Sequence, residues 1–149
     1  MYEPYTRQAL PERYYRELLG TALCVFNANN AFIIENILRN DEKKAYTWFE
    51  LIDKESGKLK GPIRDTISQK SDDIALKFDS IVEMRNRIIH SFQITSEDGT
   101  QMLATKTKIN EGNIQFRITE DYLNTFIKAN EDLAIALDTF RGENFPLCL

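Results

Sequence analysis

The sequence has little of what disulfide-rich or metal-binding domains depend on. It holds one histidine, His90, and two cysteines, Cys24 and Cys148, in 149 residues. Two cysteines without a regular spacing make neither a disulfide framework nor a zinc knuckle. No Gly-rich phosphate loop and no metal-ligand spacing is present either. We therefore expect a reduced, cytoplasmic protein that uses no metal ion and no cofactor.

Long hydrophobic runs and an excess of positive charge are missing as well. The longest uncharged stretch, 18–34, spans 17 residues and includes Asn27, Asn29 and Asn30. A membrane span needs about 20 apolar residues, and each amide is costly in hydrocarbon. We therefore interpret this stretch as a buried helix and expect no membrane contact. The formal net charge of -4 argues against a surface coated with basic residues for nucleic acid, but it leaves room for a small basic pocket.

The apolar residues that are present follow a helical period over most of the chain. Hydrophobic content of 42% suits one globular domain over residues 1–149. The period predicts helices over about 12–39, over about 42–52 behind an Asp41 cap, over 71–92 from a Ser71 cap, and over about 119–141 with Gly142 as the stop. Residues 54–62 read as an exposed loop.

After Phe92 the pattern changes from a helical period to alternation. Residues 114–118 alternate strictly between apolar and polar, and Asp98-Gly99 is a turn signal. We predict two or three short antiparallel strands between 92 and 118. The expected fold is mainly α, a bundle of four to five helices with a small antiparallel hairpin or meander inserted before the last helix.

One arginine stands where the helical wheel predicts an apolar residue. Arg85 lies at the centre of the apolar stripe of the 71–92 helix. Arginine keeps its proton, so burial requires an anion or several acceptors. Two explanations are open: an internal ion pair or subunit-interface arginine, or an anion site that a phosphate fills.

The sole histidine lies at the end of the same helix. Asn86 and His90 are i and i+4 and share one side of the helix. Arg85 and His90 are about 140° apart on a wheel of about 100° per residue, so a regular helix does not point both at one atom. They converge only if the arginine swings round, if the helix distorts, or if a second subunit supplies one of them.

The segment Arg85-Asn86-Arg87-Ile88-Ile89-His90 resembles the motif of HEPN ribonucleases, in which an arginine followed by a polar residue precedes a histidine by four to six intervening residues. The resemblance covers 71–92. It implies a helical bundle, a homodimer with the two motifs facing each other, and metal-independent cleavage of RNA by a toxin or phage-defence protein, with an antitoxin as a partner. By this resemblance Arg85, Asn86 and His90 are the catalytic candidates.

Further residues are candidates for contact with RNA or a nucleotide. We expect Arg87, Lys58 and Lys60 to bind the substrate, although the two lysines also fit a solvated turn. Asn29, Asn30 and Asn130 are either amides that line the site or satisfied core amides. The alternative function is a noncatalytic HEPN-like module that binds nucleotide or RNA or serves as a scaffold. In that case Arg85 is saturated by internal acceptors.

Overall fold

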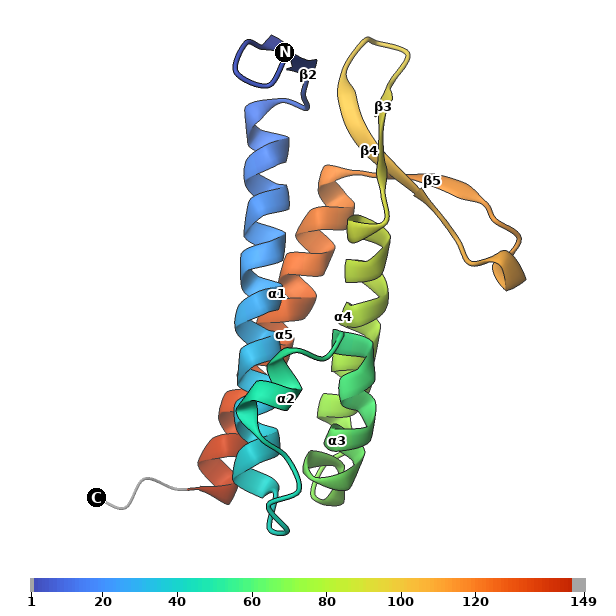
Figure 1. Cartoon of the computed structure of the whole chain (residues 1–149). Coiled ribbons are helices and arrows are strands. Elements are labelled where there is room, and N and C mark those ends of the chain that lie inside the picture. The colour runs from blue at the N-terminus through green and yellow to red at the C-terminus, as the bar shows by residue number, and fades with distance from the viewer. Residues whose placement is uncertain (1, 146–149) are drawn as a thin grey trace.

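The computed structural model describes residues 2–145, and its secondary structure is mainly helical (Figure 1). Three long helices lie side by side: α1 (Arg13–Asn40), α4 (Asp73–Ile89) and α5 (Glu120–Asn144). Two short helices, α2 (Trp48–Ile52) and α3 (Lys60–Asp65), pack against the lower half of this group. A three-stranded antiparallel sheet precedes the last helix, as the sequence predicts.

The core of the bundle lies between the three long helices. The ring of Phe26 on α1 stacks between Phe78 of α4 and Phe126 of α5, with centroid distances of 6.4 and 6.2 Å. All three side chains are at most 2% exposed. Burying a side chain of this size stabilises the fold by about 1.5–3 kcal/mol, so this stack is a main contribution to the bundle.

Helix α1 has the length and composition of a membrane span, but its position is that of a core helix. Its apolar residues Ile33, Ile34 and Ile37 are fully buried against the rest of the chain. It also buries three amides, Asn29, Asn36 and Asn40. A helix that turns amides and apolar side chains toward its neighbours is typical of the centre of a helical bundle.

The region between α1 and α4 corrects two predictions. Thr47, and not Asp41, caps α2, because its side chain accepts the N–H of Glu50 in a capping box. The predicted loop 54–62 contains a 3₁₀ turn (Ser56–Leu59) and the start of α3. Leu59 is fully buried there, and Pro62 is tolerated because it falls in the first turn of α3.

Two predicted helix boundaries were also wrong. Asp72, and not Ser71, is the N-terminal cap residue of α4, and no side chain caps this end. Helix α5 continues through Gly142 to Asn144, where Asn144 donates to the carbonyl oxygen of Phe140 at 2.8 Å. A glycine stops a helix only where the backbone turns left-handed, and the positive-φ glycines among the described residues are Gly99 and Gly112. Cys148 lies outside the described residues.

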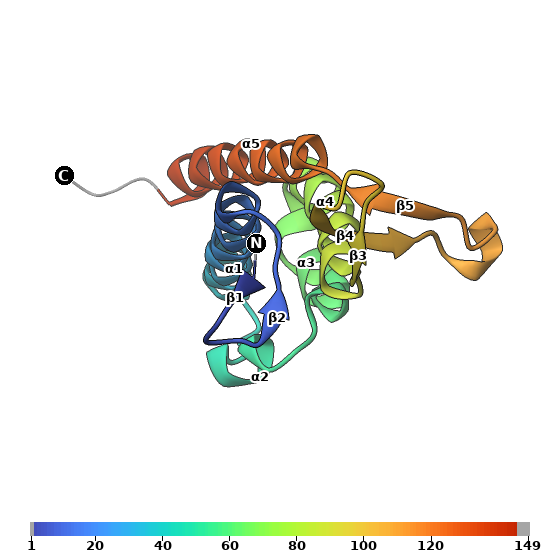
Figure 2. The ribbon, with the colours of Figure 1, turned by 90° about the horizontal axis from the view of Figure 1, so that it is seen from above.

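The first strand of the sheet begins shortly after the end of α4. Its strands β3 (Phe92–Thr95), β4 (Gln101–Lys106) and β5 (Gln115–Ile118) form a meander in the order β3-β4-β5. The hairpin of β4 and β5 projects away from the bundle, as the view from above shows (Figure 2). Two short strands that the sequence did not predict, β1 (Tyr2–Glu3) and β2 (Gln8–Ala9), pair ahead of α1.

A tyrosine of α1 fixes the inner face of this sheet to the bundle. The Tyr15 hydroxyl donates to the carbonyl oxygen of Ile118 at 2.6 Å and accepts the N–H of Leu103 at 3.2 Å. Burial raises the pKa of Tyr15, so the hydroxyl keeps the proton that it donates. The sheet is therefore held in place next to the C-terminal end of α4.

Candidate functional site

Arg85 projects from the inner stripe of α4, as its place on the wheel predicts. Its guanidinium carbon lies 5.4 Å from the centroid of the Phe26 ring, which is a cation–π arrangement. Its Nη1 donates one hydrogen bond, to Asn86 Oδ1 at 3.3 Å. Within residues 2–145 it has no carboxylate at ion-pair distance. A partly buried guanidinium with five N–H donors thus has capacity for another acceptor.

His90 lies at the C-terminal end of α4 and is exposed. Its backbone N–H donates to the carbonyl oxygen of Asn86 at 3.0 Å, which closes the last turn of the helix. Its neighbours Ile89 and Phe92 are 44% and 43% exposed. The imidazole is therefore in contact with solvent.

The structure does not bring Arg85 and His90 together within one chain. Helix α4 has no break between Asp73 and Ile89, so the angular separation of about 140° on the wheel persists. Arg85 faces α1, whereas His90 lies on the outer side of α4. Asn86 is directed to Arg85 by its side chain and to His90 only through its backbone carbonyl.

The outer side of α4 carries a basic region that sequence reasoning identified only at Arg87. Arg87 Nη1 donates to the carbonyl oxygen of Lys106 at 2.6 Å, and Lys108 forms an ion pair with Glu83. Glu83, Arg87 and His90 follow one another at spacings of four and three, so they lie along one side of the helix. These contacts place the hairpin of β4 and β5 on the same side as His90.

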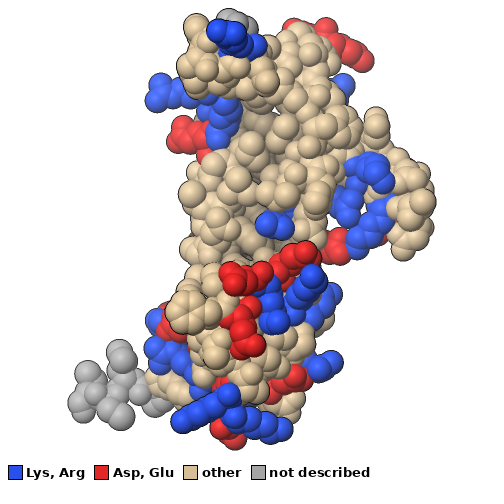
Figure 3. Space-filling view, in the orientation of Figure 1, with Lys and Arg blue, Asp and Glu red and all other residues tan. Residues whose placement is uncertain are grey.

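Charge on this face is distributed unevenly (Figure 3). Basic side chains gather over the hairpin of β4 and β5, the middle of the face over α1 and α4 is largely neutral, and further basic and acidic side chains lie at the upper end of α1. Lys106, Lys108 and Arg117 belong to the hairpin and are exposed. Their alternation with apolar residues in 101–118 was a strand signal, and nothing in the linear sequence related them to His90.

The two lysines predicted to bind substrate lie elsewhere. Lys60 forms an ion pair with Asp79 at 3.0 Å, and Lys58 pairs with Glu55 at 3.5 Å. Asp79 precedes His90 by about 16 Å along the axis of α4, from a rise of 1.5 Å per residue. The structure thus does not gather Lys58 and Lys60 around His90, and their contact with substrate stays a prediction.

The amides that could have lined a site have structural roles in two of three cases. Asn29 Nδ2 donates to the carbonyl oxygen and to Oδ1 of Asn130, at 2.7 and 3.0 Å. Asn130 in turn donates to the carbonyl oxygen of Phe126 at 2.9 Å. This buried pair joins α1 to α5. Asn30 Oδ1 is buried and accepts no hydrogen bond within the described residues.

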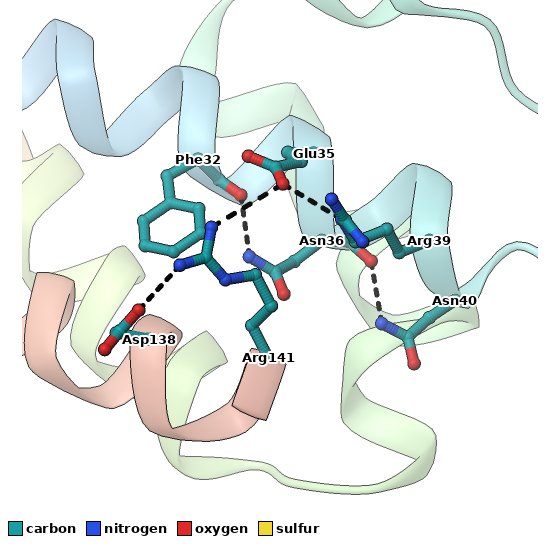
Figure 4. A network of polar contacts seen from close by, with 7 residues as sticks. All are labelled: Phe32, Glu35, Asn36, Arg39, Asn40, Asp138 and Arg141. Carbon is teal, nitrogen blue, oxygen red and sulfur yellow. Dashed lines mark hydrogen bonds and ion pairs between the residues drawn. The ribbon is translucent and has the colours of Figure 1, made fainter. Parts of the chain in front are cut away.

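A second arginine shows what a guanidinium paired with carboxylates looks like in this fold (Figure 4). The guanidinium carbon of Arg141 on α5 lies 5.0 Å from the centroid of the Phe32 ring. Its Nη2 contacts Asp138 at 2.8 Å, and its Nη1 lies 3.8 Å from Glu35, which also binds Arg39. This arginine has carboxylates on two sides, and it serves to hold α5 against α1.

Other chemistry-bearing groups are sparse around this site. In the part of the chain that the structure describes, no three histidine, cysteine, aspartate or glutamate side chains come together as a metal site would require. Near Arg85, the Tyr122 hydroxyl donates to the carbonyl oxygen of Met84 at 3.4 Å, and burial raises the pKa of this tyrosine. The groups available for proton transfer and anion binding are therefore His90 and the arginines of α4.

Comparison with known proteins gives no family for this chain. No family model matches it, and neither a curated protein nor a solved structure does. Function must therefore be argued from the residues of the site.

Proposed function

We propose that this protein is a HEPN-like, metal-independent endoribonuclease of the toxin or phage-defence type, which an antitoxin restrains. His90 is the general base and acid, Arg85 binds the phosphate, and Asn86 orients Arg85. Arg87 contacts the substrate. The observation that carries this proposal is the guanidinium of Arg85, which is partly buried without a carboxylate, on the helix that ends in the exposed His90.

The chemistry needs no group beyond these side chains. RNA brings its own nucleophile, the 2'-hydroxyl, and a neutral imidazole can take the proton of that hydroxyl. The 2'-oxygen then attacks the phosphorus atom, and the bond to the 5'-oxygen breaks. A second histidine protonates that oxygen, which leaves a 2',3'-cyclic phosphate and a 5'-hydroxyl end. A guanidinium offsets the charge that grows on the phosphate oxygens.

This proposal requires two copies of the chain. Because Arg85 and His90 point away from each other along one α4, one site must take them from two subunits. A two-fold axis near the end of α4 would bring two copies of the motif together and would supply both histidines. The exposed side chain of Ile89 supports such a contact, since an interface core is built from apolar groups.

Cleavage of a mixed RNA pool in EDTA tests the proposal. We compare the wild type with His90→Ala, Arg85→Ala and the control Arg141→Ala, each checked for folding and oligomeric state. The first two variants should lose cleavage by about 10²–10⁴-fold, and the control should retain it. The products should carry 2',3'-cyclic phosphate ends.

An absence of cleavage by a well-folded dimer, or cleavage that survives both substitutions, would rule out the enzyme. If the dimer binds nucleotide or RNA without cutting it, the alternative of a noncatalytic binding or scaffold module holds.

A further inference from the structure

The outer face of the sheet presents an aromatic ring and a cation in one row. Phe92 of β3 is directly opposite Ala104 of β4, which is directly opposite Arg117 of β5. Residues directly opposite each other in antiparallel strands project from the same face. Two strand spacings of about 4.8 Å separate Phe92 from Arg117 by about 10 Å, and the small Ala104 lies between them.

The two ends of this row are open to a ligand. Phe92 is 43% exposed, and neither a stacked ring nor a cation contacts it within the described residues. Arg117 is exposed, and its guanidinium has no hydrogen bond or ion pair to any residue of 2–145. The opposite face packs on the bundle through Thr105 and Ile118, and between the two open ends of the row Ala104 is itself only 5% exposed.

The next row and the neighbouring helix extend the positive charge. Lys106 lies directly opposite Gln115, on the same face as Arg117, and both are exposed. Arg87 reaches this strand from α4 and binds the backbone of Lys106. The chain carries a net charge of -4, so this concentration of cations is local and not a property of the whole surface.

His90 is adjacent to this face along the chain. Phe92 follows His90 by two positions, and an extended chain spans at most about 7 Å over that distance. A base stacked on Phe92 would thus bring its ribose close to the imidazole.

We propose that the outer face of the sheet binds single-stranded RNA, with a base stacked on Phe92 and backbone phosphates at Arg117 and Lys106. Aromatic stacking beside cations is how sheets hold unpaired nucleic acid, because every base has a face to stack and every linkage a charge. Double-stranded RNA keeps its bases inside the helix, so we expect it not to bind to this face. The proposal rests on the proposed function for its substrate class, and it adds the surface that selects and aligns the strand.

Binding without cleavage isolates this surface. Fluorescence anisotropy measures the Kd of a labelled single-stranded RNA for His90→Ala, alone and combined with Phe92→Leu, Phe92→Tyr or Arg117→Gln. Phe92→Leu should raise Kd by about 5- to 150-fold, and Phe92→Tyr should restore it, as expected for one stacked base. Arg117→Gln should reduce the slope of log K against log salt by about 0.7, as expected for one phosphate.

Matched controls use an aromatic and an arginine outside this face. Phe49 of α2 is 79% exposed, and Arg64 of α3 is exposed, so Phe49→Leu and Arg64→Gln should leave Kd unchanged. A Kd insensitive to Phe92→Leu and to Arg117→Gln overturns the proposal. So does a shift in oligomeric state caused by Phe92→Leu, because the ring would then belong to a subunit contact.

Failure of this proposal and failure of the proposed function are distinguishable. If Phe92 and Arg117 control Kd but the protein with His90 intact does not cleave, the RNA-binding surface stands and the enzyme falls. If cleavage depends on His90 and Kd does not depend on the sheet, the enzyme stands and the RNA-binding surface falls.

Discussion

The guanidinium groups of Arg141 and Arg85 both lie over phenylalanine rings of α1, but only the guanidinium of Arg141 is close to carboxylates. Arg141 stacks on Phe32 between two carboxylates, whereas Arg85 stacks on Phe26 with one amide oxygen at 3.3 Å. The first guanidinium has its electrostatic partners inside the fold. The guanidinium of Arg85 also lies over an aromatic ring, but it has no carboxylate beside it among the described residues. The difference identifies Arg85, and not Arg141, as the cation with room for an external anion.

The largest expected effect concerns the aromatic ring under Arg85. Phe26→Ala should lower the free energy of unfolding by about 3–5 kcal/mol, because it removes the middle ring of the buried stack with Phe78 and Phe126. Urea denaturation measures the loss. The control Phe32→Ala removes a partly buried ring and should cost less. Equal losses of unfolding free energy in the two variants would contradict the difference in burial between Phe26 and Phe32.

The two arginines themselves should differ in their effect on stability. Arg141→Met should destabilise the protein by about 1–2 kcal/mol, since it breaks two ion pairs and a cation–π contact. Arg85→Met should change stability by less than about 1 kcal/mol, because it leaves no carboxylate unpaired. In 1 M NaCl the cost of Arg141→Met should shrink, as charge screening predicts. The comparison fails if Arg85→Met is the more damaging change.

Inorganic phosphate should distinguish the two arginines by ligand binding. At ten times its Kd, phosphate should stabilise the wild type by about 1.4 kcal/mol. Thermal unfolding at constant ionic strength should show this gain for the wild type and for Arg141→Met, and not for Arg85→Met. A gain that survives in Arg85→Met would place the anion at another cation.

The smallest expected effect concerns Asp98, a carboxylate that neutral hydrogen-bond donors stabilise and that has no arginine beside it in the described part of the chain. Hydrogen bonds from the Ser96 hydroxyl, and then from the Thr100 hydroxyl and backbone N–H, lower the pKa of Asp98 from 3.8 to about 2. Because the folded pKa is depressed, the contribution to stability is present above about pH 4 and is lost as the pH falls toward 2. Acid unfolding of Asp98→Asn should show a weaker pH dependence in that window, and an identical curve would contradict this assignment.

Much of the fold could be predicted because helices and strands depend on local patterns. The periods over about 12–39, 71–92 and 119–141 predicted the three long helices, which run over 13–40, 73–89 and 120–144, and alternation predicted the meander. The short elements were missed where the pattern was brief. The segment that became α3 contains glycine and proline, and it is helical because Leu59 and Ile63 find a buried site against the bundle.

The candidate site could be predicted only in its helical part. Spacing along α4 placed Arg85 on the inner stripe, next to Asn86 and away from His90. It gave no sign of Lys106 and Arg117, because strand pairing and the fold of the hairpin bring them to α4. It also associated Lys58 and Lys60 with the site on charge alone, and the fold pairs them with Glu55 and Asp79.

By itself, the sequence determined which face of each helix turns inward and that one of these faces carries an arginine, since both follow from the rise and turn of the backbone. Only the tertiary structure decided whether that arginine meets a carboxylate. Arg141 meets Glu35 of α1, whereas no acidic side chain of the described residues lies at ion-pair distance from Arg85. A partner supplied by a distant segment is a property of the packed chain, and no local pattern encodes it.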